Sequence, residues 1–167
     1  MTDGVIDGVG TVSIRAVERD HPRPPSASSW DDWGDMDPAA KDLDIQRWLI
    51  ELTDGNGHAD TVGDLSAHVV WYGPTPGSRA LNIGISLIEE HRGHGIGAVA
   101  QWLLAEELHR RGTVRVEAST DVENVAEQRA LAKAGFVLEG TLALAQSRRD
   151  GLHDLQVWAH VRAPHSR

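Results

Sequence analysis

The sequence predicts one mixed α/β domain, in which helices flank a central mixed β-sheet. Three observations predict it: apolar residues alternate in several segments, they recur at helical spacing in others, and these segments follow a definite order. From residue 61 the order is strand, strand, helix, strand, helix, strand, strand, so two hairpins enclose a strand–helix–strand unit. The 167 residues suffice for one such domain and would be cramped as two.

The first third of the chain predicts strands and loops around one helix. Residues 11–17, "TVSIRAV", alternate like a strand, and the proline-rich residues 21–29 predict a loop. Residues 39–48 are interpreted as a helix, and "WLIEL", which begins at Trp48, fits either the end of that helix or a strand. "DGNG" at residues 54–57 is typical of a hairpin turn.

Two strands with one apolar face each follow. From residue 65 the odd positions are apolar and their even neighbours are polar, the apolar ones being Leu65, Ala67, Val69 and Trp71. "GPTPG" at residues 73–77 predicts a turn, and residues 81–87 alternate again.

The first of the two later helices begins near Ile96 and carries apolar residues at helical spacing as far as Leu108. Gly112 fits its C-terminal cap. Two glutamates stand four residues before two arginines, which favours ion pairs along the helix: Glu106, Glu107, Arg110 and Arg111.

The second of these helices is predicted over residues 124–135, with Asn124 as its N-terminal cap and Glu127 three residues later. The preceding "VRVEA" at residues 114–118 predicts a short strand. Two further strands are predicted near residues 136–147 and 153–162.

Charge is distributed unevenly along the chain. The net charge is −9, and residues 1–64 hold 14 acidic and 5 basic residues, whereas residues 65–167 hold 11 of each. Much of the acidic excess lies in "WDDWGDMD" at residues 30–37, where four side chains could recruit a cationic substrate: Trp30, Asp31, Asp32 and Trp33. A solvated loop is the alternative interpretation.

Composition also excludes several classes of protein. No basic stripe is present to bind nucleic acid. No apolar run reaches the roughly 18 residues that a membrane helix needs, and the first residues lack a signal-peptide pattern, so we expect a cytoplasmic protein. The chain has no cysteine, which excludes disulfides, thiolate metal sites and a cysteine nucleophile.

The most informative motif is "HRGHGIGAVA" at residues 91–100, where Gly93, Gly95 and Gly97 precede and open a helix. A helix N-terminus offers unpaired N–H groups, and glycines let an anion approach them. The motif therefore predicts a site for a pyrophosphate, with the Arg92 guanidinium as a further donor. A tight turn would need only one of these glycines.

A dinucleotide site is the rival from another enzyme class. Gly93, Gly95 and Ala98 formally satisfy the dinucleotide fingerprint, and Glu117 stands near the position expected for a ribose-binding acid. Residues 89–92, however, separate the strand from the first glycine, and the chain has no second nucleotide-binding half.

Arg92, Gly95 and Gly97, after a strand and at the start of an amphipathic helix, resemble the acyl-CoA pyrophosphate loop of the GNAT N-acetyltransferase superfamily. Asn124 stands eleven residues before "GF" at Gly135, as in that family. "GFVLEG" and "DGLHDLQVWAHV" resemble the branch that acetylates ribosomal-protein N-termini and some antibiotics. The resemblance implies a single acetyltransferase domain over residues 1–167, with an acetyl-CoA-binding core at residues 80–163 and a variable, acidic acceptor side at residues 1–64.

The resemblance also implies roles for individual residues. The loop would hold the pyrophosphate of acetyl-CoA, the co-substrate, through Arg92, Gly93, His94, Gly95, Ile96 and Gly97. The backbone amide of Leu87 would bind the acetyl carbonyl and the oxyanion that develops from it. Asn124 would touch the pantetheine or the thioester end, in addition to capping its helix.

The implied chemistry is direct attack of an amine on the thioester, for which a general base is useful because alkylammonium groups are mostly protonated at pH 7. We expect Glu117 to be that base, directly or through a water, with an ion pair to Arg115 or a neighbouring strand as the alternative. Asp64 and His68 are reserve candidates.

The sequence departs from the family at the position of a tyrosine that is proposed to protonate the leaving thiolate. That position is Leu131, and the only tyrosine, Tyr72, is expected to lie elsewhere. Ser119 or water would then supply the proton. The N-terminal-acetylating branch often has serine where this chain has Glu127, which weakens the transfer of that branch's substrate.

These residues together predict an acetyl-CoA-dependent N-acetyltransferase whose acceptor is a primary amine, either a cationic small molecule or a peptide N-terminus. A catalytically silent acyl-CoA-binding module is the alternative. No metal is expected, because His91 and His94 lack a third ligand in register. A homodimer is common among the proteins it resembles.

Overall fold

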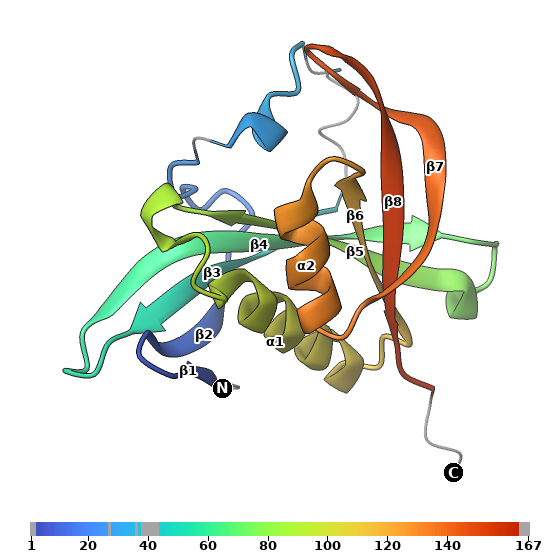
Figure 1. The fold of residues 1–167 in the computed structure, drawn as a ribbon. Helices are drawn as coiled ribbons and strands as arrows, with labels where there is room; N and C mark the ends of the chain where they lie inside the picture. The colour runs from blue at the N-terminus through green and yellow to red at the C-terminus, as the bar shows by residue number, and fades with distance from the viewer. Residues whose placement is uncertain (1–2, 27, 36, 38–43, 164–167) are drawn as a thin grey trace.

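The computed structural model describes residues 3–26, 28–35, 37 and 44–163. Eight strands form one sheet in the order β1-β2-β3-β4-β5-β6-β8-β7 (Figure 1). The strands are β1 Asp3–Ile6, β2 Gly10–Val17, β3 Gln46–Thr53, β4 Ala59–Trp71, β5 Arg79–Leu87, β6 Arg115–Asp121, β7 Val137–Arg148 and β8 Gly151–Val161. The helices are α1 Ile96–Arg110 and α2 Val125–Lys133, with short 3-10 helices η1 Ser29–Asp31, η3 Pro76–Ser78 and η4 Glu89–His91.

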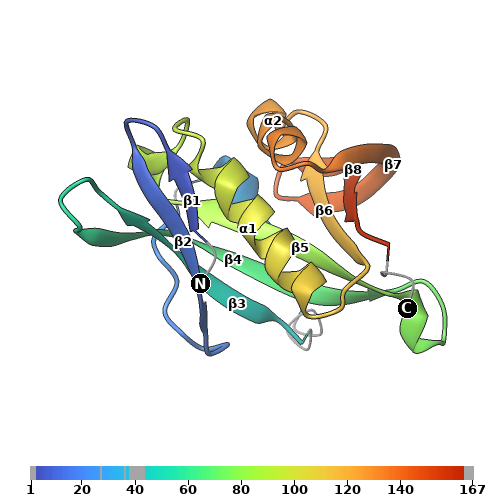
Figure 2. The same ribbon diagram turned by 90° about the horizontal axis from the view of Figure 1, so that it is seen from below.

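The predicted fold class is confirmed, since β5 and β6 pair in parallel and every other neighbouring pair is antiparallel. Both α-helices cover the same face of the sheet (Figure 2). None of the described helices has the length and apolar character that a membrane span requires.

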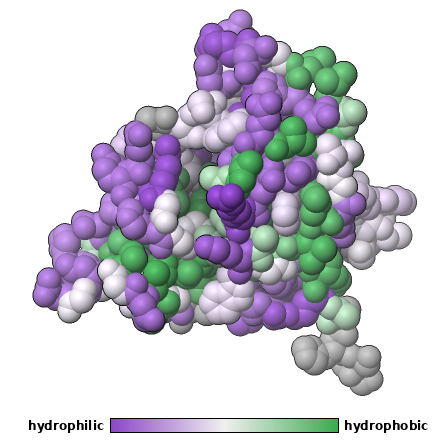
Figure 3. Space-filling view, in the orientation of Figure 1, coloured by the Kyte–Doolittle hydropathy of each residue, from purple (hydrophilic) through white to green (hydrophobic). Residues whose placement is uncertain are grey.

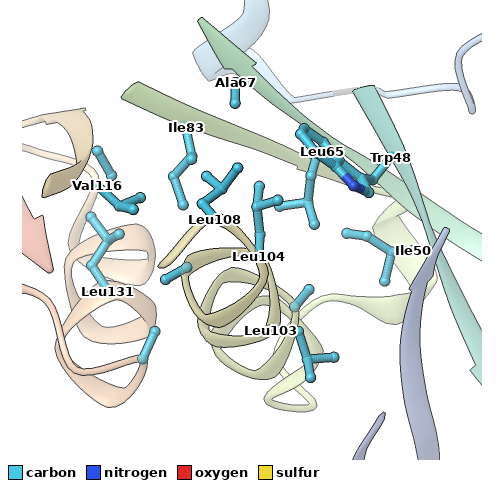
Figure 4. Packing of buried hydrophobic residues seen from close by; sticks show 14 of the residues in the cluster. Trp48, Ile50, Leu65, Ala67, Ile83, Leu103, Leu104, Leu108, Val116 and Leu131 are labelled. Carbon is cyan, nitrogen blue, oxygen red and sulfur yellow. The ribbon is translucent and has the colours of Figure 1, made fainter. Parts of the chain in front are cut away.

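The core lies between this sheet face and the helices. Leu103, Leu104 and Leu108 of α1 are at most 1% exposed, and Leu104 and Leu108 point toward Leu65 and Ile83 of the sheet (Figure 4). Burial of each of these side chains stabilises the fold by about 1.5–3 kcal/mol and holds α1 against the sheet. Leu131 of α2 is completely buried in the same cluster, so the residue at the tyrosine position of the family is part of the core.

One predicted element is wrong, namely the helix over residues 39–48. Residues 39–43 lie outside the described part of the chain, and β3 begins at Gln46. Trp48 and Ile50 alternate into the core while β2 and β4 pair with β3 on both sides, so sheet pairing overrides a helix here. The strand interpretation of "WLIEL" is confirmed.

Two smaller expectations hold only in part. The predicted pair of Glu107 with Arg111 is confirmed, and Glu107 also pairs with Arg110, whereas Glu106 pairs with Arg162 just past β8. Trp71 is 59% exposed although the alternation places it on the apolar face. The short strand β1, which pairs with the start of β2, was not predicted.

The parallel pair β5–β6 is short, and this feature positions the site. Its register covers Leu81 to Ile83 on β5 and Val116 to Ala118 on β6. Beyond that point β5 continues beside β4 as far as Leu87, and β6 continues beside β8 as far as Asp121. The two strands therefore diverge beyond this point, as their ribbons show (Figure 1), and we call the region between their ends the mouth.

Candidate functional site

The glycine loop connects the end of β5 to α1 at one side of the mouth. Gly93 and Gly95 have φ values of 78° and 83°, in the left-handed region that glycine favours. A Cβ at Gly93 would have no atom within 4 Å, and one at Gly95 would meet only Ile6 Cδ1 at 4.0 Å. Open space thus lies in front of both residues. Gly97 is different, because it is helical and packs against Leu87 and Ile85 at ordinary contact distances.

The backbone N–H groups of this loop are available to a ligand. Within the described residues, the amides of residues 93–98 donate to no protein acceptor, and Val99 is the first amide with a helical partner, the Gly95 carbonyl at 3.3 Å. These amides stand at the positive end of a helix of 15 residues. The open cradle and its unpaired donors fit a diphosphate.

Arg92 is held at the base of the loop. Its Nε and Nη2 donate to the Leu87 carbonyl at 3.1 and 2.9 Å, so the guanidinium fastens the loop to the end of β5. The positive charge of Arg92 still lies beside the loop. Two of the guanidinium donors that we expected to bind phosphate, however, are used for the contact with Leu87.

The Leu87 amide faces the mouth. Ile88 donates to the Val62 carbonyl of β4 at 3.0 Å, which makes Val62 and Ile88 a hydrogen-bonded pair of the antiparallel ladder. Bonded and non-bonded pairs alternate, so the N–H of Leu87 points away from β4. Since β6 has already diverged there, the N–H is directed at the mouth, where a carbonyl oxygen can accept it.

Asn124 stands on the opposite side of the mouth, at the start of α2. Its Oδ1 accepts the Glu127 N–H at 3.2 Å, which confirms the cap, and its own N–H donates to the Asp121 carbonyl at 3.1 Å. The Nδ2 group has no partner among the described residues, so it remains free to bind a ligand.

Ser119 lies one residue beyond the last parallel pair, where β5 and β6 begin to diverge. Its Oγ accepts a hydrogen bond of 3.2 Å from Asn82 Nδ2. This placement next to the mouth is compatible with proton donation, and that role stays a prediction.

Glu117 lies in the closed part of the ladder and is 2% exposed. Tyr72 Oη donates to its Oε1 at 2.7 Å, and Arg115 Nε donates to the same oxygen while its Nη groups bind Glu139. Tyr72, expected elsewhere, is therefore a direct partner of Glu117; burial, followed by this contact, raises the pKa of Tyr72 and keeps its proton in place. The geometry favours the ion-pair alternative that the sequence leaves open.

The reserve candidates have different surroundings. Asp64 is 2% exposed and accepts hydrogen bonds from Arg47 Nη2 and Arg23 Nε at 3.1 Å each, so its charge is held in ion pairs with two arginines. Burial lowers the pKa of His68, which favours its neutral form. Within the described ranges, no group of three or more His, Cys, Asp or Glu side chains is arranged so that it could hold a metal ion.

Glu127 is predicted from the sequence to support the cap of α2 and to depart from the family, and it has no predicted catalytic role. It does not complete a capping box, because the Asn124 N–H is bonded to Asp121. Its carboxyl instead interacts with Gln101 of α1, and burial raises the pKa of Glu127 to about 7. Gln101 is 1% exposed, and its Oε1 has no partner among the described residues, so a protonated Glu127 can donate to it.

We expect Glu127→Gln to stabilise the protein at alkaline pH. The pKa near 7 in the folded state lies above the ordinary value of 4.5, so folding stability falls as the pH rises from 4.5 through 7. Urea unfolding at pH 8 should show a free energy of unfolding about 1–3 kcal/mol higher than that of the wild type, with little difference at pH 4. Glu123 is exposed and serves as the control. An equal increase in the free energy of unfolding in Glu123→Gln would show that the effect comes only from the change in net charge.

The acidic segment near η1 packs on the turn between β7 and β8. The Arg148 guanidinium lies 5.3 Å from the Trp30 ring centroid and 4.9 Å from that of Trp33, and Arg149 Nε donates to both carboxylate oxygens of Asp32 at 2.8 and 2.9 Å. We call residues 28–34 the strap. Its aromatic rings and Asp32 already bind cations of the chain itself; the Asp31 side chain lies outside the described part. Figure 3 shows hydrophilic residues gathered over this end of the molecule.

Comparison with known proteins gives one family. A family model described as an acetyltransferase (GNAT) domain matches residues 9–137. No curated protein matches the chain.

Solved structures share the fold. RimL, a ribosomal L7/L12 alpha-N-protein acetyltransferase in complex with coenzyme A, is 24% identical with a TM-score of 0.60, over 73% of this chain and 64% of that one. The chain thus spans less than two thirds of RimL. Ribosomal-protein-S5-alanine acetyltransferase from Vibrio fischeri is 21% identical with a TM-score of 0.61, over 77% and 67%. Mycobacterium smegmatis RimJ, in complex with CoA-disulfide, is 20% identical with a TM-score of 0.64, over 96% and 90%.

Proposed function

This chain belongs to the GNAT acetyltransferase family, and we propose that it transfers the acetyl group of acetyl-CoA to a primary amine. The observation that carries the proposal is two sets of free N–H donors at the end of β5, on one side of the mouth. Unpaired amides of residues 93–98 suit a diphosphate, and the Leu87 N–H suits a thioester carbonyl. Complexes of similar structures with coenzyme A support the same ligand.

The residues at the mouth would divide the work as follows. The loop and Arg92 would fix the diphosphate, and Asn124 Nδ2 would contact the pantetheine. The Leu87 N–H would stabilise negative charge on the carbonyl oxygen as the amine attacks, an interaction whose loss in other acyl-transfer enzymes costs about 10²–10³ in rate. Ser119 is the proposed proton donor to the thiolate, which has a pKa near 8.5 and needs only modest help.

The second candidate is a silent acyl-CoA-binding module. Two observations favour it. A buried leucine, Leu131, occupies the position where the family has a tyrosine, and Glu117 is bonded to Arg115. Release of free CoA decides between the two. Acetyl-CoA mixed with a panel of amines should liberate thiol for at least one amine if the chain is an enzyme, whereas tight binding of CoA without turnover on any amine would support the module.

We further propose that the acceptor is a cation, because the whole acidic excess lies in residues 1–64. A cationic small molecule and a peptide N-terminus both satisfy this condition; RimL, whose structure is similar, is described as acting on a ribosomal protein. A homodimer stays a prediction.

Neutralisation of Asp31 and Asp32 by asparagine should raise KM for cationic amines about threefold to tenfold and leave KM for neutral acceptors unchanged, since two negative charges that attract a cation are lost and Arg149 loses its ion pair with Asp32. Initial rates over an amine panel measure this. Asp60→Asn, at an exposed position of β4 and also within residues 1–64, removes a charge away from the strap and is the matched control. Unchanged rates on cations would overturn the cationic acceptor.

A further inference from the structure

A buried carboxylate and a histidine form a close pair at the end of β6. Asp121 is 0% exposed, and its Oδ2 lies 2.6 Å from Nδ1 of His153 on β8. This oxygen has no aligned hydrogen bond among the described residues, so the imidazole is its close polar neighbour. The other oxygen, Oδ1, accepts the Glu123 N–H at 2.8 Å. A buried carboxylate this close to Nδ1 limits the rotation of the ring and favours a proton on that nitrogen.

The pair belongs to the rim of the mouth. Asp121 is the last residue of β6, three residues beyond the final parallel pair with β5, so the β5 side of this segment is open. Its carbonyl accepts the N–H of Asn124, the residue proposed to contact the pantetheine. One aspartate thus connects the turn that carries Asn124 to the imidazole of His153.

The pair also lies next to the strap, which is part of the predicted acceptor side, residues 1–64. Arg148 Nη1 donates to the Trp30 carbonyl, and Arg148 Nε lies 3.7 Å from Asp121 Oδ2. The strap therefore packs directly next to the pair, and Figure 1 shows η1 beside the tip of the β7–β8 hairpin. The His153 side chain is 18% exposed, so part of it is accessible to solvent.

Several other ionisable groups near the sheet are held in contacts that do not suit proton abstraction. Glu117 is bonded to Arg115 and Tyr72, and Asp64 is bonded to Arg47 and Arg23. His109 and His160 bond to each other at 2.8 Å. Among the described histidines, His153 alone contacts a fully buried carboxylate while part of its ring remains exposed.

We propose that His153, oriented by Asp121, is the general base that takes the proton from the acceptor ammonium. The proposal rests on the proposed function. One proton of the ammonium passes to Nε2 of His153, and the freed lone pair forms the new C–N bond. The C–S bond breaks with its electron pair on sulfur, Ser119 gives its hydroxyl proton to the thiolate, and a second N–H proton of the attacking nitrogen restores the Ser119 hydroxyl. His153 returns its proton to solvent.

Three charged groups surround the ring and set its titration. Asp150 Oδ1, from the β7–β8 turn, lies 2.9 Å from Nε2; Asp121 of β6 faces Nδ1; and Arg148 of β7 lies on the far side of Asp121. The contact with Asp150, followed by the charges of Asp150 and Asp121, raises the pKa of His153 above its ordinary 6.5. Asp150 is 75% exposed and can rotate away when an ammonium approaches Nε2.

The first test uses the free protein. Titration of the histidine side chains by NMR should give His153 a midpoint above 6.5, and Asp150→Asn should move this midpoint to lower pH. The second test uses turnover. The acid limb of the pH profile of kcat/KM should coincide with the NMR midpoint and move with it in Asp150→Asn, which a purely structural His153 would not cause.

His153→Gln should lower kcat by about 10²–10⁴-fold, the usual contribution of a general base, with CoA affinity in calorimetry unchanged. If wild-type protein binds no CoA or acetylates no amine, the proposed function itself fails. Two results would overturn only the role of His153 while wild-type turnover is present. One is an acid limb of the pH profile that does not move in Asp150→Asn, and the other is a His153→Gln variant that turns over at the wild-type rate.

Discussion

Gly95→Val is expected to weaken CoA binding by at least about 100-fold, equivalent to roughly 2.7 kcal/mol. Gly95 has φ of 83° and caps α1, with open space before it. A valine there both strains the backbone and places a branched side chain where the diphosphate must approach the amides. Isothermal titration calorimetry with CoA measures the loss.

Gly57→Val is the matched control for strain. Gly57 has nearly the same φ, 84°, also lies in open space, and belongs to the β3–β4 turn. Both variants should lose about 1–3 kcal/mol of stability, but only Gly95→Val should lose CoA. Equal CoA affinity in the two variants would contradict the role of the loop.

Arg115→Met is expected to destabilise the protein by roughly 3 kcal/mol, because it leaves the carboxylate of Glu117 buried without a cation. Glu117 is 2% exposed, and Tyr72 would be its remaining partner. We place the loss at the lower end of the range for broken buried pairs, since the Arg115 side chain is 27% exposed. Urea unfolding at pH 7 gives the value.

Glu139→Gln provides the control, because it removes the other, more exposed partner of the same arginine. It should cost no more than about 1 kcal/mol. Addition of Glu117→Gln to Arg115→Met should recover part of the loss, since the buried charge is then gone. A loss below 1 kcal/mol in Arg115→Met would mean that this pair contributes little to stability.

The same variants decide the role predicted for Glu117. If Glu117 serves the ion pair, Glu117→Gln should retain turnover within about threefold once corrected for folded protein. A fall of about 100-fold or more, with CoA affinity intact, is the usual loss of a general base and would support the original prediction and argue against His153.

Local signals in the sequence were sufficient for much of the fold. Alternation located β2, β4 and β5, and helical spacing with the caps Asn124 and Gly112 located α1 and α2. The glycine loop was also predictable, because its φ values and its place before a helix are both local properties of the chain. The prediction failed at residues 46–48, where pairing with two neighbouring strands determines the structure.

The site contacts that the sequence could not supply are long-range. Tyr72 and Glu117 are 45 residues apart, and Asp121 meets His153 only because β6 pairs with β8. Arg148 and Arg149 occupy the aromatic and acidic groups of the strap from more than 110 residues away. Nothing in the local sequence around Trp30 indicates that the cation over its ring is Arg148 of the same chain.

Amide NMR during a titration with CoA tests the central claim most directly, because the backbone N–H groups are the proposed ligands. The account predicts that the largest shifts occur at residues 93–98, and that dephospho-CoA, which keeps the diphosphate, causes the same shifts. Saturation with CoA that leaves these amides unchanged, or an absence of any binding, would contradict it.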